Sequence, residues 1–284
     1  MYAKPGNRFE VLTVKEGTTV QTKRLTALVL ALVLLSPLFA HAEESGMDAF
    51  YDLAALAVAR EGETIHLQIP QSYYSGETIY KGKTGKPLTG ACALHCAAVV
   101  ISNLKGQTVT GQQVAKANNR DIRRDTSWTP FVSWGKVGDA FSVRIRTEDM
   151  AQYGARLKQR GVKTSERRVR KMARLVELLG QSAPDSGLVV HFNSSGRLNG
   201  SGTHRHAVVL IGWIERDGAI VDLLVNDSSI PAPLGVCVRM SESSLPVSIL
   251  GKRKAGQADA RGDNLAMILM DYAVSCRWVR TEEN

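Results

Sequence analysis

Three residue types that together activate a thiol nucleophile occur in this chain in suitable settings. Cys92 follows Thr89 and Gly90 and opens an apolar, alanine-rich segment. His206 opens the apolar run 206–213, and Asp227, beside Asn226, ends the next apolar run. A thiol, an imidazole that takes its proton and a carboxylate that orients the imidazole form the usual set for nucleophilic catalysis by cysteine.

Cys92 is the better of two candidate nucleophiles. The segment 92–104 is predicted to be a helix, and the first turn of a helix presents unpaired N–H groups and the positive end of the dipole. That environment stabilises a thiolate. Cys96 lies one turn deeper among Ala97, Ala98 and Val100, where a small buried residue is expected. We therefore predict that Cys92 carries the chemistry.

His206 is the predicted base, and Asp227 or Asn226 is predicted to hold its ring. The dipeptide Asp217-Gly218 is typical of a hairpin turn, so the end of strand 220–225 should return beside the start of strand 206–213. A carboxylate or amide there could fix the tautomer of His206. Two alternatives remain open: Asn-Asp-Ser-Ser also favours a simple turn, and a single histidine more often has a structural role.

The elements that must position these residues are helices in the first half of the chain and strands in the second. Hydrophobic periodicity predicts helices at 43–60, 92–104, 110–117, 147–159 and 169–179, and strands at 64–69, 188–192, 206–213, 220–225, 236–240 and 272–278. The stretch 118–136 looks polar and irregular, and the stretch 250–263 is polar. This segregation predicts an α+β fold, with N-terminal helices packed against a C-terminal, mainly antiparallel sheet.

Residues 1–42 have the features of a secretory signal peptide. Lys23 and Arg24 precede the apolar run 25–40, and Ala40-His41-Ala42 resembles a cleavage site. The alternative is a membrane anchor, but a run of 16 residues that includes Pro37 is short for a span. We expect a single mature domain over 43–284, periplasmic or secreted, without stable membrane insertion after cleavage.

The chain of 284 residues has a formal net charge of +9, and basic residues gather between Arg156 and Arg174. The cluster lacks interleaved aromatic residues, which disfavours nucleic acid as a partner. A solvated helix face is the simpler interpretation, and contact with an anionic surface is the alternative. Trp128 and Trp134 could line a substrate cleft, although packing in the interior is the simpler interpretation.

Four cysteines occur in this chain, and the predicted export permits disulfides. Cys237 and Cys276 lie in strand-like runs, and either a cross-link between them or two buried thiols fits the sequence. The spacing of Cys92, His95, Cys96, His204 and His206 matches structural zinc sites poorly, and no cofactor is implied.

The segments 92–100, 188–191, 206–213 and 225–227 resemble the papain-like cysteine peptidases of the C39-like, bacteriocin-processing type. The resemblance implies a papain-like fold, with Cys92 as nucleophile, His206 as base and Asp227 as orienting residue. This chain departs from the family pattern at two positions. Ala93 follows the cysteine where the family often has Gly, and Lys86 stands where the family places a Gln of the oxyanion hole; Gln68 and Gln71 lie too far upstream to match.

The sequence therefore predicts an exported cysteine hydrolase that cleaves a peptide or peptide-like amide bond of a peptide or protein substrate. Two alternatives remain: a catalytically weak or inactive binding protein on the same scaffold, and a transglutaminase-like acyl transferase that uses the same nucleophile.

Overall fold

The structure is a computed structural model, and it describes residues 10–13, 58–68, 92–118, 133–198, 205–230 and 235–280. Within these ranges, one antiparallel sheet runs in the order β1-β2-β5-β4-β8-β3, with β6 beside β5 and β7 beside β6. Its strands are β1 (Glu10–Thr13), β2 (Glu63–Leu67), β3 (Arg144–Glu148), β4 (Leu188–Asn193), β5 (Arg205–Arg216), β6 (Ala219–Asn226), β7 (Val238–Arg239) and β8 (Ala273–Arg280).

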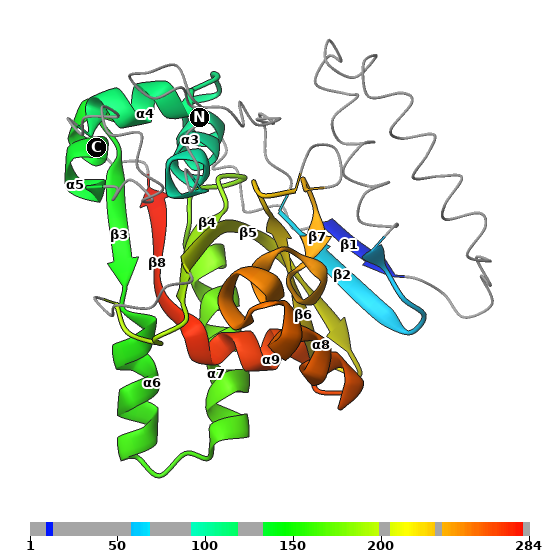
Figure 1. The fold of residues 1–284 in the computed structure, drawn as a ribbon. Coiled ribbons are helices and arrows are strands. Elements are labelled where there is room, and N and C mark those ends of the chain that lie inside the picture. Colours follow the sequence, from blue (N-terminus) through cyan, green and yellow to red (C-terminus); the bar gives the residue numbers. More distant parts are fainter. Residues whose placement is uncertain are drawn as a thin grey trace.

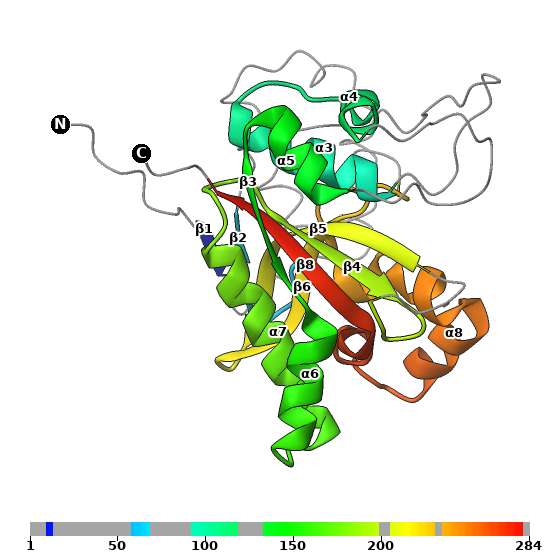
Figure 2. The same cartoon turned by 90° about the vertical axis from the view of Figure 1, so that its left-hand side faces the viewer.

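Helices cover both faces of this sheet (Figures 1 and 2). On one side lie α3 (Cys92–Lys105), α4 (Gly111–Ala117) and α5 (Trp134–Phe141), packed into a core with Val189, Val209 and Val279 of the sheet. The opposite core contains residues of α6 (Met150–Gln159), α7 (Thr164–Gly180) and α9 (Leu265–Leu269). The chain is thus a mixed helix and sheet protein with an antiparallel sheet, as the sequence predicts.

The central strand β5 organises the sheet. Along one edge it pairs first with β4, over Arg205 to Leu210, and then with β2, over Gly212 to Arg216. Along the other edge it pairs with β6. The β5–β6 turn contains Asp217 and Gly218, both with positive φ (52° and 73°), which is the backbone that an Asp-Gly hairpin turn favours. The predicted hairpin is confirmed, and it returns the end of β6 toward the start of β5.

The helix α3 is apolar around most of its circumference, and its residues from Ala93 to Asn103 are buried. A helix with this pattern must be enclosed on several sides. It contacts β4, β5 and β8 below it and α4 beside it (Figure 1). The two predicted helices at 92–104 and 110–117 are confirmed within one residue at each end, and so is the strand at 64–69 over its described part.

Two predictions along the chain are wrong, and one helix was not predicted. The helix predicted at 147–159 begins only at Met150, after the cap residue Asp149, because residues 144–148 form β3. The segment 118–136 is not wholly irregular, because α5 begins at Trp134. The polar stretch 250–263 contains α8 (Lys252–Ala260), which buries only Ala255 and Ala258 and therefore has no wide apolar stripe to detect.

The remaining short elements lie between β7 and β8. They are η1 (Met240–Glu242), η2 (Pro246–Leu250) and η3 (Met270–Tyr272). Residues Ser243 and Ser244, between η1 and η2, approach the end of β6. Of the predicted helix at 43–60, only Val58 to Arg60 lie within the described residues. Of the predicted signal peptide, only β1 is described, and it pairs with β2.

Candidate functional site

Cys92, His206 and Asp227 come together where α3 meets the sheet. Cys92 is the first residue of α3 and is partly exposed. His206 is the second residue of β5, and Asp227 directly follows β6. Since α3 packs on β5 and the β5–β6 hairpin returns to its own start, three positions distant in sequence meet at one point.

The ring of His206 is held by Asp227. His206 Nε2 lies 2.8 Å from Asp227 Oδ1, and the two side chains are 4% and 0% exposed. Asp227 Oδ1 also accepts the N–H of Ser229 at 3.0 Å. Its Oδ2 accepts the N–H of Ser244 at 2.8 Å and the Ser244 hydroxyl at 2.6 Å. Both carboxylate oxygens therefore have partners that stabilise the charged form and fix its position.

The thiol of Cys92 is hydrogen-bonded to the side chain of His206. Because Asp227 binds Nε2, the ring nitrogen left for the sulfur is Nδ1. The backbone N–H groups of Ala93 and Ala207 also donate hydrogen bonds to the sulfur. The first turn of α3 and the start of β5 thus surround the sulfur with donors.

These contacts shift three pKa values in a mutually consistent way. Burial would raise the pKa of Cys92, but the hydrogen bond and positive charge of His206 outweigh it and hold that pKa below its ordinary value. Burial would lower the pKa of His206, but Asp227 and Cys92 raise it to about 10. Burial opposes ionisation of Asp227, yet His206 and Ser244 lower its pKa to about 2. The arrangement favours a thiolate beside an imidazolium that a carboxylate supports.

The two residues predicted to orient His206 have different contacts. Asp227 binds His206, whereas the side chain of Asn226 is hydrogen-bonded to His95, one turn into α3. Burial lowers the pKa of His95 to about 4, so this histidine is neutral at neutral pH. Asn226 thus ties β6 to α3 beside the site rather than holding the ring of His206.

The other three cysteines have environments that oppose ionisation. Cys96 is fully buried, and burial raises its pKa well above the ordinary value. Burial also raises the pKa of Cys237 and Cys276 to about 12. All four cysteines are free thiols, and Cys237 and Cys276 belong to cores on opposite faces of the sheet. The disulfide considered for this pair is absent from the structure.

A cavity of about 150 Å³ opens at the site. Its walls include Cys92 and His206, and also Trp134 of α5, His191 of β4 and Arg277 of β8. Trp134 meets His191 edge-on at 5.9 Å between ring centroids. Trp134 is 8% exposed and lines the cavity. It therefore packs in the interior and also forms part of a cleft wall, so both predicted roles apply to it. Trp128 lies outside the described residues.

Gln68 does not contribute to this site. Its side-chain oxygen accepts the N–H of Gly187 at 3.3 Å, and its amide group donates to the Ala183 carbonyl at 3.5 Å. It therefore joins the end of β2 to the loop before β4. Lys86, Gln71 and His204 lie outside the described residues.

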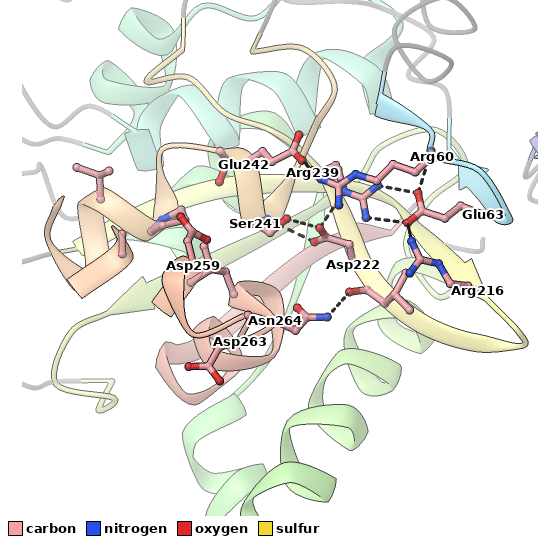
Figure 3. A pocket seen from close by; sticks show the side chains of 17 residues that line it. Arg60, Glu63, Arg216, Asp222, Arg239, Ser241, Glu242, Asp259, Asp263 and Asn264 are labelled. Carbon is pink, nitrogen blue, oxygen red and sulfur yellow. Dashed lines mark hydrogen bonds and ion pairs between the residues drawn. The ribbon is translucent and has the colours of Figure 1, made fainter. Parts of the chain in front are cut away.

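A second, larger cavity of about 720 Å³ lies on another side of the sheet (Figure 3). Arg239 occupies its wall, bridging Glu63 at 2.7 Å and Asp222 at 3.2 Å. Glu63 also pairs with Arg216, and Asp222 accepts the Ser241 hydroxyl. These charges neutralise one another, and the network joins β2, β5, β6 and β7; Asp259 and Asp263, which also line the cavity, are not part of it.

Several residues of the basic cluster pair with acids on α7 itself or on neighbouring elements. Arg168 binds Asp271, Arg170 binds Glu166, and Arg174 binds both Glu148 and Glu177. Most of the cluster lies on α6 and α7, where many of these side chains are exposed or partly exposed. The contacts fit the interpretation of a solvated helix face.

Metal-binding groups and membrane-spanning helices would each indicate a particular kind of protein. Among the described residues, no group of three or more histidine, cysteine or acidic side chains is arranged to hold a metal ion. None of the helices in the described ranges combines the length and the apolar character needed to cross a bilayer. Comparisons with protein-family models, curated proteins and solved structures found no match for this chain.

Sequence reasoning missed several residues of the site. Ser229 and Ser244 support Asp227, and His191 and Arg277 line the cavity. The Asn-Asp-Ser-Ser run after β6 was a partial signal for Ser229, since such runs form turns with side-chain to backbone hydrogen bonds. Ser244, His191 and Arg277 come from other elements, and no local pattern links them to Cys92.

Proposed function

We propose that this chain is a cysteine hydrolase with a papain-like arrangement, which cleaves a peptide or peptide-like amide. The observation that carries the proposal is the hydrogen-bonded series Cys92–His206–Asp227 at the mouth of a cavity. Shifts that push a thiol toward its anion and an imidazole toward its cation, in one cleft, are typical of functional sites. The other three cysteines are poor nucleophiles because burial raises each pKa.

The proposed reaction is acyl transfer to water. The Cys92 thiolate attacks the amide carbonyl, and the electron pair of the C=O bond moves to oxygen. When the tetrahedral species collapses, the C–N bond breaks and His206 gives its proton to the departing amine. Water then attacks the thioester, with His206 accepting its proton, and the acid product leaves as the thiolate is restored. Asp227 keeps the imidazole oriented and supports its charge.

The start of α3 supplies stabilisation for the oxyanion. The N–H of Cys92 lies at the N-terminus of a 14-residue helix, where no intrahelical acceptor exists for it. Loss of one oxyanion donor typically costs about two to three orders of magnitude in rate. Lys86 replaces the Gln that the resembled family uses, so the second donor is expected from another group.

The test is hydrolysis of a degenerate peptide library, followed by mass spectrometry of the products. We expect cleavage by the full chain, and loss of cleavage in Cys92→Ser and His206→Ala. Cys96→Ala is the matched control, because alanine suits that position of an alanine-rich helix, and it should retain cleavage. Cleavage that persists in Cys92→Ser would overturn the proposal, and so would a Cys92 thiol that ionises like a free cysteine.

The acyl-transferase alternative shares the nucleophile and the acyl-enzyme. Adding a labelled primary amine to the same assay distinguishes the two: covalent incorporation of the amine into peptides, in place of hydrolysis, would identify a transferase. A protein that only binds peptides would give neither product. The reactive environment of Cys92 favours chemistry over binding alone.

We also propose that the protein acts outside the cytoplasm, in the periplasm or after secretion. The basic lead, apolar run and small-residue cleavage site in residues 1–42 support export. Expression with fractionation tests it: the processed chain should appear in the periplasmic or extracellular fraction. Replacing apolar residues of the segment 25–40 with charged ones should retain the unprocessed chain in the cytoplasm.

A further inference from the structure

Arg277 is a partly buried cation in the wall of the cavity that holds Cys92, and no acid of the described residues lies within ion-pair distance of it. It lies on β8, and its side chain is only partly exposed. Its Nη1 donates to the Ser275 hydroxyl at 2.8 Å. Its Nε is buried and has no hydrogen-bond acceptor within the described ranges. The other arginines with buried settings, such as Arg239, are paired with carboxylates.

A desolvated guanidinium without a carboxylate partner destabilises the folded protein unless another group compensates its charge and its lost hydrogen bonds. A buried charge is normally paired, and a buried donor without an acceptor loses the hydrogen bond it had to water. The Trp134 ring, 5.4 Å from the guanidinium carbon, provides a cation–π contact. Such a contact offsets part of the desolvation but neither neutralises the charge nor accepts the Nε hydrogen bond. The Ser275 hydroxyl is likewise a neutral acceptor.

A second residue of the cavity wall also has an unpartnered polar atom. His191 Nε2 is buried and has no hydrogen-bond partner among the described residues. Burial is the main cause that lowers the pKa of His191 to about 3. The positive charges of Arg277 and His206 lower it further. At neutral pH His191 is therefore uncharged, and it offers a second polar contact without adding to the local positive charge.

From this geometry we propose that the cavity is an acyl-group or leaving-group subsite for a carboxylate-bearing amide, with Arg277 as the residue that binds the carboxylate. The inference rests on the proposed function and deepens it by naming a substrate class. A carboxylate accepts two parallel hydrogen bonds from the planar guanidinium and neutralises its charge. The size of the cavity, about 150 Å³, suits a group of a few heavy atoms beside the attacked carbonyl.

The carboxylate belongs to the substrate near the scissile bond, as an amino-acid side chain or as a free main-chain carboxylate. A neutral amide of the same shape would leave Arg277 uncompensated and would bind less well. Specificity of this kind is strong because the site must otherwise keep an unpaired charge. Arg277 is thus a specificity-determining residue and takes no part in the bond changes at Cys92.

Thiol-directed probes test the subsite without a known substrate. N-iodoacetylglycine carries a carboxylate a few bonds from the reactive carbon, and N-iodoacetylglycinamide is its neutral match. In both, the Cys92 thiolate attacks the methylene carbon, the C–S bond forms, the C–I bond breaks and iodide leaves with its electron pair. The measured quantity is the ratio of the two alkylation rate constants at Cys92, followed by mass spectrometry at constant ionic strength.

We expect the wild-type chain to favour the carboxylate probe, and Arg277→Gln to lower the ratio by about tenfold, the effect of one charged hydrogen-bonded contact. Arg277→Lys should recover part of the ratio, because it keeps the charge and loses the planar fork. Arg261→Gln, an exposed site after α8, is the matched control for net charge and should keep the wild-type ratio. An unchanged ratio in Arg277→Gln overturns the proposal.

A measurement on the wild-type chain remains decisive if the Arg277 variants do not fold. N-acetylglycine should slow alkylation of Cys92 by iodoacetamide, whereas N-acetylglycinamide at the same concentration should slow it less. Equal protection by the two compounds contradicts the subsite. The two proposals fail separately: slow reaction of Cys92 with every probe at mildly acidic pH defeats the nucleophile, whereas fast reaction without a carboxylate preference defeats only the subsite.

Discussion

His206 and Asp227 are 21 positions apart in the chain, and the β5–β6 hairpin brings His206 Nε2 within 2.8 Å of Asp227 Oδ1. The contact is almost fully enclosed, since the two side chains are 4% and 0% exposed. Ser229 and Ser244 bind the remaining positions on the carboxylate. A buried carboxylate with this many donors serves as a fixed negative charge, and the cavity of Cys92 is built next to it.

Replacement of Asp227 by Asn should lower stability in a pH-dependent way. The folded-state pKa of Asp227 is about 2 against an ordinary value of 3.8, so its contribution to stability is present above about pH 4 and is lost as the pH falls toward 2. Breaking a buried charge pair typically costs about 3–5 kcal/mol. Denaturant unfolding of the wild-type chain and of Asp227→Asn from pH 2 to 6 measures the difference in their free energy of unfolding. A stability difference that does not shrink on acidification would contradict this account.

Replacement of His206 by Ala should make the Cys92 thiol harder to ionise than an ordinary thiol. The imidazolium is the main group that offsets the burial of the sulfur, so the pKa of Cys92 should rise above its ordinary value once it is gone. At pH 6 the rate of alkylation by iodoacetamide should fall by about tenfold or more. His66→Ala, on β2, is the comparison variant, and a similar fall there would show that the effect is unspecific.

Ser244 should act as a positioning residue for Asp227. Its hydroxyl donates to Asp227 Oδ2 at 2.6 Å and lies 3.2 Å from His206 Nε2. Ser244→Ala removes one donor to the carboxylate, so the pKa of Asp227 should rise, and peptide cleavage should fall severalfold. The acid limb of the pH profile for unfolding should move upward with it. Ser244→Thr keeps the hydroxyl and should restore the profile, which a purely steric effect would not allow.

Hydrolysis should depend on pH through two groups of the site. The rate should increase as Cys92 ionises, at a pH below the ordinary value for a thiol, and should decrease as His206 loses its proton near pH 10. The profile of kcat/KM measures both limits in the free enzyme. A rate that begins to rise only near pH 9 would mean that Cys92 is not paired with an imidazolium.

If the chain is exported as we propose, its mature form should begin at Glu43. Cleavage after Ala42 would remove β1 and leave β2 as the outer strand of this part of the sheet. N-terminal sequencing of the protein recovered outside the cytoplasm gives the answer directly. Recovery of a chain that still contains Glu10 to Thr13 would show that β1 belongs to the mature protein and that the segment 1–42 is not removed.

The chemistry-bearing residues were largely predictable because each lies in a local pattern. Cys92 opens an apolar helix, His206 opens an apolar strand, and an Asp-Gly turn brings Asp227 back toward that strand. The hairpin needed only neighbouring residues, so its register followed from the sequence. That α3 packs against β5, which brings the thiol to the imidazole, is a tertiary contact; the sequence supported it only through the family resemblance.

The supporting residues were not predictable, because no local sequence pattern links them to the site. Arg277 stands in a mostly apolar strand, and nothing next to it signals that Trp134 and His191 share its cavity. Ser244 lies in a short connection between η1 and η2. β3 was missed because Arg144 to Glu148 is mostly polar, as suits an outer strand whose side chains are largely exposed. Asn226 was expected near His206 but binds His95.

The central claim is that the pKa of Cys92 lies below its ordinary value because the thiolate is paired with the His206 imidazolium. The most direct measurement is the thiolate absorbance near 240 nm as a function of pH, taken as the difference between the wild-type chain and Cys92→Ser. The account predicts that one thiolate appears in that difference at a pH below the ordinary thiol value of 9.0. A difference signal that appears only at or above pH 9 would contradict it.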